Sequence, residues 1–167
     1  MIVRTEQPGD HDAVRALNVA AFGTPAEADL VDTLRAQARP AISLVAEQGG
    51  QVVGHIMLTP VSLAGDPQAK IIGLAPMAVA PARQRQGIGS ALVDAGLQRC
   101  RDLGFSAVVV LGHPAYYPRF GFQPAVRFGI ACEYEAPLDA FMLVELVPGC
   151  LAGLAGIVHY HPAFKGV

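Results

Sequence analysis

The sequence has no tryptophan, and aromatic residues make up only 7% of its 167 residues. It also has no block of Lys or Arg. Its 12 basic residues are scattered and outnumbered by 14 acidic ones, so the net charge is −2. Proteins that bind nucleic acids typically carry a basic patch interleaved with aromatic residues. The composition therefore predicts no nucleic-acid partner.

Cysteine is also scarce. The three cysteines, Cys100, Cys132 and Cys150, are odd in number and widely spaced. This spacing fits neither a disulfide framework nor a CxxC metal site, and it predicts free, buried thiols in a reducing compartment. His159 and His161 would share one face of a strand, but two ligands without a third do not make a metal site. We therefore expect no bound metal.

Long hydrophobic runs are absent as well, and the start "MIVRTEQPGDHD" does not resemble a signal peptide. We therefore expect a cytoplasmic protein with no membrane partner. Hydrophobic residues make up 52% and charged residues 16%, which is typical of one ordered domain, here spanning 1–167. The mean hydropathy of +0.38 is high. We interpret it as a well-filled core together with a surface for a homodimer formed through the apolar C-terminal strands.

The first half of the chain predicts a strand, two helices and a hairpin. The first five residues alternate like a strand, and Asp10 can cap a helix that ends near Phe22. Thr24, Pro25 and Glu27 have the spacing of a capping box with proline at the first helical position. We assign Glu27 to this cap rather than to substrate binding. The runs "AISLVAEQ" and "QVVGHIMLTPVSL", joined by "GG", predict a hairpin.

The second half predicts further strands around one long helix. "DPQ" predicts a turn into the strand "AKIIGLAPMAVAP", which we expect to bulge or part from a neighbour at Pro76. "GIGSALVDAGLQRCRDLG" predicts a helix closed by Gly104, and "FSAVVVLG" a buried strand. A turn at "PAYYPRFG" and late strands "FMLVELVPG" and "GIVHYHPAF" complete a mixed α/β sheet. The helix face expected to be buried carries Ile88, Leu92, Ala95 and Leu103.

The segment "RQRQGIGSAL", residues 83–92, carries the main functional signal. Gly87 and Gly89 lie between a predicted strand and a helix N-terminus, where unpaired N–H groups and the helix dipole favour an anion. Glycine permits unusual backbone angles and keeps Cβ atoms out of the way. A plain turn is the alternative, but we favour a bound phosphate or pyrophosphate. Leu92 stands where a Rossmann loop needs Gly or Ala, and a Walker A loop lacks its Gly-Lys-Ser/Thr. A dinucleotide-binding oxidoreductase is therefore the weakest alternative.

Two motifs resemble the GNAT superfamily of N-acetyltransferases. "MAVAPARQRQGIGSALV" is similar to its acetyl-CoA loop, with Gln84 and the two glycines in the places of the family pattern. "YYPRFGF" is similar to its Tyr-x-x-x-Gly-Phe element, with Tyr117 first. The resemblance covers nearly the whole chain and is closest to a small bacterial branch. Two features depart from the family. "VVLGHPAYY" lacks the Asn that many members carry after this strand, and Pro118 shortens any helix at the tyrosine.

The resemblance implies a GNAT-type fold and a set of acetyl-CoA contacts. Backbone N–H groups from Gln84 to Ser90 would bind the pyrophosphate, and the strand around Ala78 would pair with the pantetheine amides. Arg83 and Arg85 would steer the phosphates rather than form plain solvated surface. The implied cofactor-binding residues are Met77, Ala78, Val79, Gln84, Arg85, Gln86, Gly87, Ile88, Gly89 and Ser90.

The implied reaction moves acetyl from acetyl-CoA to an amine by direct attack. Tyr117 is the predicted proton donor, because a phenol of pKa about 10 facing a thiolate of about 8.5 is uphill by only roughly 2 kcal/mol. A core tyrosine is the alternative reading. A backbone N–H on the Ala78–Val79 strand would stabilise the oxyanion. The alternative function is a non-catalytic CoA-binding or sensor domain of the same fold.

The general base and the acceptor stay open at this stage. Glu47, His55 and His113 are candidate bases acting through a bridging water, although His55 lies mid-strand among apolar residues and fits a structural role better. A small-molecule or peptide amine is expected as the acceptor.

Overall fold

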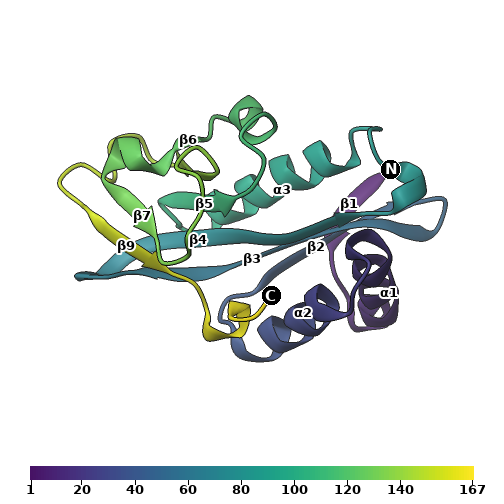
Figure 1. The fold of residues 1–167 in the computed structure, drawn as a ribbon. Coiled ribbons are helices and arrows are strands. Elements are labelled where there is room, and N and C mark those ends of the chain that lie inside the picture. Colours follow the sequence, from purple (N-terminus) through teal and green to yellow (C-terminus); the bar gives the residue numbers. More distant parts are fainter. The chain divides into compact units, whose positions relative to one another are not determined.

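The computed structural model describes all residues, 1–167, and the chain forms two compact units. The first unit comprises Met1–Thr59, Ala75–Gly96 and Pro162–Val167. The second comprises Pro60–Leu74 and Leu97–His161. The elements are labelled along the chain in Figure 1. None of the helices combines the length and the apolar character needed to cross a membrane.

The strands of the first unit follow the order β1-β2-β3-β4. β1 (Ile2–Thr5) pairs antiparallel with β2 (Ile42–Gln48), and β2 pairs antiparallel with β3 (Gln51–Leu63). The turn between them is Gly49-Gly50, with φ of +58° and +78°, which is the backbone of a tight two-residue hairpin. This confirms the predicted hairpin. The last residues of β4 (Asp66–Val79) complete the unit's strands.

Two helices cover one face of β2 and β3 in this unit. α1 (His11–Phe22) and α2 (Ala26–Gln37) pack against each other on that face (Figure 1). Their apolar stripes meet inward-pointing residues of the strands, because side chains alternate between the faces of a sheet. The resulting core contains Val14, Leu30, Val31, Leu34, Ala38, Val45 and Met57.

The start of α3 (Ile88–Asp102) packs on the opposite face of β3. A Cβ at Gly54 would lie 2.8 Å from Ile88 Cγ2 and 2.9 Å from Leu92 Cδ1, so only glycine lets helix and strand approach this closely. One helical turn further on, a Cβ at Gly96 would come within 3.1 Å of Leu58 Cδ1. This close packing holds the first turns of α3, and hence the loop before it, against the sheet.

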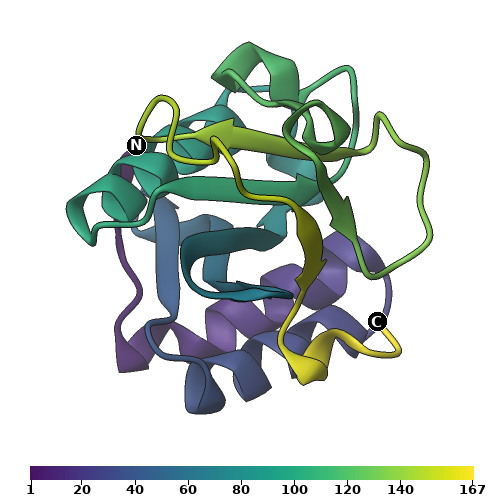
Figure 2. The ribbon, with the colours of Figure 1, turned by 90° about the vertical axis from the view of Figure 1, so that its left-hand side faces the viewer.

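The second unit holds the strand order β4-β5-β8-β6. β4 pairs parallel with β5 (Ala107–Leu111) from Ile71–Ala107 to Gly73–Val109. β5 in turn pairs antiparallel with β8 (Phe141–Glu145), and the two strands lie side by side in Figure 2. β6 (Gln123–Pro124) pairs with β8.

The end of β3 also belongs to this unit and pairs antiparallel with β9 (Gly156–His159). β9 pairs parallel with β7 (Ile130–Cys132). Parallel and antiparallel pairs together make the sheet mixed, which confirms the predicted mixed α/β class. The unit's buried core is Val61, Leu63, Ile71, Ala107, Val109, Ala125, Ile130, Phe141, Leu143, Leu151 and Val158.

Five short 3-10 turns connect these elements. They are η1 (Pro8–Asp10), η2 (Pro81–Arg83), η3 (Tyr117–Phe120), η4 (Ala125–Phe128) and η5 (Pro162–Phe164).

Both predicted N-terminal caps differ from expectation. The Asp10 carboxylate accepts from the Arg4 guanidinium at 2.7 and 3.0 Å and from the Gln7 N–H, so it does not cap α1. The Thr24 hydroxyl donates to the Glu27 carboxylate at 3.2 Å, and no side chain caps α2. Both helices nevertheless form where predicted, because their apolar faces are buried against the sheet.

Three other predictions were wrong or incomplete. Leu103 is 51% exposed, because the buried stripe of α3 continues through Leu97 and Cys100 and the helix ends at Asp102. The turn expected at "DPQ" lies earlier, since β4 already begins at Asp66. The strand also runs on through Pro76, but its pairing with β5 ends at Gly73. The two short strands β6 and β7 were not predicted.

Candidate functional site

The connection from β4 to α3 has an unusual backbone. After η2 the chain is extended at Gln84, then takes positive φ at Arg85 (63°) and again at Gly87 (85°). α3 begins at the next residue, Ile88. Positive φ is uncommon outside glycine, so Arg85 is the unusual residue of this loop, and its conformation favours a built loop over a plain turn.

The backbone amides of this loop are not used by the protein's own backbone. None of the N–H groups from Gln84 to Gly89 donates to a backbone carbonyl, whereas the Ala91 N–H donates to the Gly87 carbonyl at 3.1 Å. Residues 84–87 are exposed. Unpaired amides at a helix N-terminus, together with the positive end of the helix dipole, form a site for an anion. The loop therefore fits the phosphate or pyrophosphate site that the sequence predicts.

Position 87 requires glycine because of its backbone conformation and not because neighbouring atoms leave no space for a side chain. A Cβ built there meets no atom within 4 Å, but φ of +85° is costly for any residue with a Cβ. The open side also leaves room for a ligand's oxygen atoms next to the amides.

The side chains around the loop divide into two groups. Gln84 donates from Nε2 to the Val79 carbonyl at 3.3 Å, which ties the loop to the end of β4. Arg83 donates to the Gln48 side chain at 2.8 Å, so this arginine supports the hairpin end rather than standing free for a phosphate. Arg85 and Gln86 are exposed.

The three predicted strand residues lie at the end of β4 in the same unit as the loop. Ala78 is buried, whereas Met77 and Val79 are half-buried. The Ala80 N–H donates to the Val53 carbonyl at 2.8 Å and holds the strand end against β3. All the predicted cofactor-binding residues, 77–79 and 84–90, thus belong to one continuous, well-anchored segment of the first unit.

Tyr117 lies in the second unit, at the start of η3. The residue is 7% exposed, and three aromatic rings lie around its own ring. Tyr116 lies edge-on at a centroid distance of 5.1 Å, Phe122 at 5.6 Å and Phe120 at 6.4 Å. The hydroxyl makes no hydrogen bond and is not fully buried, so the polar tip reaches the surface while the ring is enclosed.

Burial raises the pKa of Tyr117 to about 12, and the neighbouring Tyr116 adds to the rise. Removing the phenolate from water is unfavourable, so the neutral phenol is favoured. Tyr117 therefore stays protonated at neutral pH. It is also a weaker acid than the free phenol assumed from the sequence.

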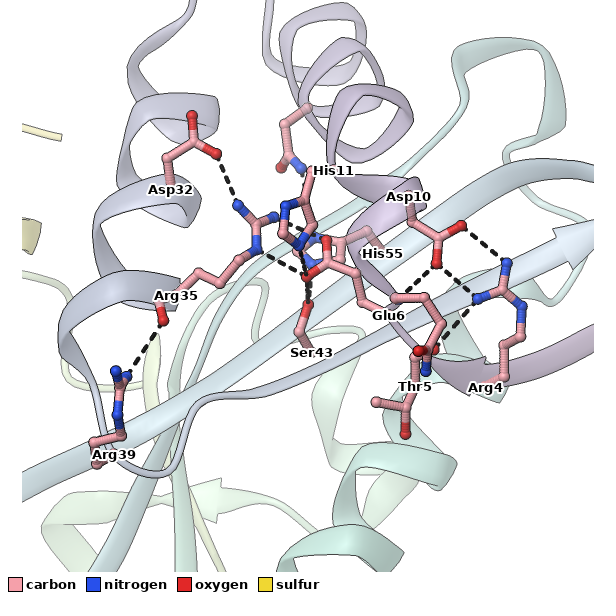
Figure 3. Close-up of polar contacts among 12 residues, drawn as sticks. Arg4, Thr5, Glu6, Asp10, His11, Asp32, Arg35, Arg39, Ser43 and His55 are labelled. Carbon is pink, nitrogen blue, oxygen red and sulfur yellow. Dashed lines mark hydrogen bonds and ion pairs between the residues drawn. The ribbon is translucent and has the colours of Figure 1, made fainter.

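His55, one of the candidate bases, lies in a buried polar network of the first unit (Figure 3). The ring is fully buried and lies 2.8 Å from the Ser43 hydroxyl through Nε2. Ser43 donates to Glu6 at 3.1 Å, and Glu6 accepts two bonds from Arg35 at 2.9 and 2.8 Å. Asn18 Nδ2 lies 3.4 Å from the other ring nitrogen.

These contacts assign the proton on the His55 ring. Because the Ser43 hydrogen is used toward Glu6, Nε2 must carry the hydrogen donated to Ser43 Oγ, and Nδ1 accepts from Asn18. Burial lowers the pKa of His55 to about 4. A neutral, enclosed ring with both nitrogens occupied has no access to a substrate amine, which favours the structural role.

Of the other two candidate bases, Glu47 has an engaged side chain, whereas His113 is exposed and contributes only its backbone carbonyl to the fold. Glu47 accepts from Arg4 at 3.1 Å. The His113 carbonyl accepts from the Tyr116 and Tyr117 amides and shapes the turn before η3. All three cysteines are free, as predicted, but only Cys100 is buried, whereas Cys132 and Cys150 are half-buried. No group of three or more His, Cys, Asp or Glu side chains is arranged to hold a metal ion.

The partners of His55 could not be found from the sequence, because Glu6, Asn18 and Ser43 come from separate elements. No local sequence motif indicates these partners. The signal available was only that a histidine within an apolar strand needs hydrogen-bond partners.

A central strand that leads through an amide-lined loop into a helix, followed by a parallel strand and an aromatic turn, is the arrangement of acyl-CoA-dependent N-acetyltransferases. The sequence model of the acetyltransferase (GNAT) family matches residues 11–122. That match covers more than half of the chain, and the chain therefore belongs to the GNAT family.

Individual relatives extend the match over the whole chain. The uncharacterized N-acetyltransferase YhbS of Escherichia coli strain K12 is 37% identical over 166 residues, 99% of each chain. The crystal structure of E. coli YhbS in complex with CoA superposes with a TM-score of 0.91 and 36% identity, over 98% of this chain and 91% of that one. A GNAT acetyltransferase from Brucella melitensis in complex with acetyl-CoA gives 0.80 and 37%, over 98% and 97%.

These matches confirm the predicted family, fold and enzyme class. The chain is an N-acetyltransferase, and the non-catalytic alternative is not favoured.

Proposed function

We propose that the segment 84–90 binds the pyrophosphate of acetyl-CoA and that the enzyme transfers the acetyl group to a small-molecule or peptide amine. The observation that carries the proposal is the run of amides from Gln84 to Gly89 with no backbone acceptor, at the N-terminus of a helix. Relatives that match nearly the whole chain were crystallised with CoA or acetyl-CoA. Arg85 contributes positive charge beside the amides.

The end of β4 binds the rest of the cosubstrate in this proposal. The backbone of Met77, Ala78 and Val79 pairs with the pantetheine amides, as a neighbouring strand would. A backbone N–H of the same stretch donates to the carbonyl oxygen as negative charge develops on it. Gln84 supports this arrangement by holding the Val79 carbonyl.

Tyr117 acts as hydrogen-bond donor to the departing sulfur. With a pKa of about 12, full transfer of its proton to an ordinary thiolate of pKa about 8.5 is uphill by about 5 kcal/mol. The hydroxyl therefore chiefly stabilises the developing thiolate while the C–S bond breaks. The proton lost by the attacking amine replaces any proton that Tyr117 gives up, so the reaction is balanced without an added acid.

The amine must attack in its neutral form. Deprotonating a lysine-type amine at pH 7 costs about 4.6 kcal/mol, whereas an α-amine of pKa about 8 costs roughly 1.4 kcal/mol. Because His55 is enclosed and Glu47 is held by Arg4, we propose that neither of them acts as the base and that the amine enters the site in its neutral form. This favours acceptors of low amine pKa.

We further propose that the two units act as one domain spanning 1–167, in the cytoplasm, without metal, nucleic acid or membrane. A homodimer would cover apolar side chains of the second unit such as Ile157 on β9, which is 46% exposed. Sedimentation at several concentrations tests the dimer, and a Ile157→Asp variant should shift the equilibrium toward monomer.

The decisive test of function is a panel of amines assayed with acetyl-CoA by the thiol released. The panel contains spermidine, kanamycin, free amino acids and short peptides with free N-termini. We expect turnover with at least one amine and a rise in melting temperature with acetyl-CoA but not with NAD. Absence of both turnover and stabilisation would refute the proposal, and stabilisation without turnover would favour a sensor.

A matched pair of glycine variants tests the loop itself. Gly87 and Gly65 have almost the same φ, +85° and +86°, and a Cβ meets nothing within 4 Å at either. Both alanine variants should lose about 1 kcal/mol of stability. Only Gly87→Ala should weaken acetyl-CoA binding, by about tenfold or more, as measured by calorimetry. Equal affinities in the two variants would show that the loop does not bind the cosubstrate.

A further inference from the structure

Gly112, the residue directly after β5, lies against the ring of Tyr117. A Cβ built on Gly112 would lie 2.6 Å from Cε2 of that ring, 3.2 Å from Cδ2 and 3.5 Å from Cζ. Two carbon atoms in contact normally lie about 3.5–4.0 Å apart. Any side chain at position 112 must therefore displace either the Tyr117 ring or the backbone of residue 112.

The need for glycine here is a matter of space and not of backbone conformation. Gly112 is not among the glycines with positive φ, so its backbone angles suit other residues. Gly121, at the end of the same turn, is the opposite case, because its φ is +94° and a Cβ would meet only Val144 at 3.5 Å. Gly112 is thus selected by the position of the tyrosine ring.

Neither side of this contact is free to yield. The Gly112 N–H donates to the Ala140 carbonyl at 3.0 Å, and the preceding residue, Leu111, is paired with Phe141 of β8. On its other sides the Tyr117 ring meets Tyr116, Phe120 and Phe122. The ring is therefore held between a fixed backbone and an aromatic cluster.

We propose that Gly112 is a positioning residue for acetyl transfer: its missing side chain sets where the Tyr117 ring lies and so where its hydroxyl points. This inference rests on the proposed role of Tyr117 as donor to the sulfur. A displacement of a donor by about 1 Å is enough to cost a large factor in rate. Cosubstrate binding, which the proposal assigns to residues of the first unit, does not depend on this contact.

The kinetic test measures Gly112→Ala and the control variant Gly9→Ala. Each is made both in the wild-type background and in the Tyr117→Phe background. Gly9 is a matched control, because its φ is not positive and a Cβ there meets nothing within 4 Å. The assay is thiol release from acetyl-CoA with the most active amine of the panel, or with water if no amine is active. Gly112→Ala should lower kcat about tenfold or more, with KM for acetyl-CoA within about twofold of wild type, and Gly9→Ala should change neither. In the Tyr117→Phe background, Gly112→Ala should have no further effect.

The outcomes separate this proposal from the function it rests on. If Tyr117→Phe has wild-type kcat, the donor role fails and the positioning role falls with it. If Tyr117→Phe is slow but Gly112→Ala is not, or if Gly112→Ala lowers kcat equally in both backgrounds, the donor role stands and the positioning role is wrong.

Thermal unfolding tests the contact without relying on catalysis. The drop in melting temperature caused by Gly112→Ala should disappear in a Tyr117→Ala background, where the ring is absent. If Gly112→Ala alone fails to fold, the double variant must fold at least as well as Tyr117→Ala. A drop of equal size in both backgrounds would show that the side chain meets something other than the ring, and would overturn the proposal.

Discussion

His55 in the first unit and Tyr117 in the second are both aromatic, titratable and buried, yet their surroundings are opposite. Burial favours the neutral form of each ring, lowering the pKa of His55 to about 4 and raising that of Tyr117 to about 12. His55 has polar partners on both ring nitrogens. Tyr117 is held by aromatic rings and by the backbone of Gly112, and its hydroxyl has no hydrogen-bond partner within the protein.

The difference teaches that a shifted pKa does not by itself mark a catalytic group. A buried polar atom whose hydrogen bonds are complete stabilises the fold and cannot take part in chemistry without breaking them. A polar atom that reaches the surface from an enclosed ring is held rigidly and can still bond to a substrate. That combination is what a transfer reaction requires of a donor.

The largest effect is expected from Tyr117→Phe, which removes only the hydroxyl. Turnover should fall on the order of 10³-fold, as expected for loss of a positioned proton donor. Acetyl-CoA affinity should stay within about twofold, because the proposed binding groups are backbone amides of the first unit. Steady-state kinetics and calorimetry on the same preparation measure both quantities, and wild-type turnover would place Tyr117 with His55 among the structural residues.

The next largest effect concerns His55 and acid stability. Its folded pKa of about 4 lies below its ordinary value of 6.5, so between these pH values the unfolded state binds more protons. Stability is therefore full above pH 6.5 and is lost as the pH falls toward 4, by up to about 3 kcal/mol. Of the charged neighbours, Glu6 raises the pKa of His55 and Arg35 lowers it, so their effects oppose each other.

Urea unfolding at several pH values measures this slope. A His55→Leu variant should be less stable at pH 7 but should lose the His55 part of the pH dependence. An unchanged slope in His55→Leu would contradict the burial argument.

A smaller effect is expected from Ser43→Ala. The change leaves the His55 Nε2–H without its acceptor and takes one donor from Glu6, which should destabilise the fold by about 2 kcal/mol. Turnover at a temperature well below unfolding should be unchanged. A loss of kcat with intact stability would instead connect this network to catalysis.

The smallest effect is expected from Tyr134→Phe in the second unit. The Tyr134 hydroxyl is buried with no hydrogen-bond partner, and its ring stacks on Tyr160 at 5.9 Å. Removing an unsatisfied buried hydroxyl should leave stability unchanged or raise it by up to about 1 kcal/mol. Kinetics should match wild type, which makes this variant the control for Tyr117→Phe.

Much of the fold followed from local patterns. The Gly49-Gly50 hairpin, the buried strand β5 and the end of α1 at Phe22 lie where the sequence predicts them. The loop before α3 was also predicted, because its glycines and the following helix are neighbours in the chain. The exposed Leu103 and the two- and three-residue strands β6 and β7 were not predicted, because short pairings and the end of a buried helix face depend on partners distant in sequence.

The sequence by itself determined the family, the mixed α/β class and the position of the glycine loop before α3, since each depends on residues close together along the chain. Only the tertiary structure decided which buried ring is structural and which is available. Asn18 from α1 and Ser43 from β2 reach His55 on β3, and Gly112 meets the Tyr117 ring only because a strand end and a turn fold onto each other. Hydrogen bonding and steric exclusion act through space, and no spacing of residues in the sequence specifies them.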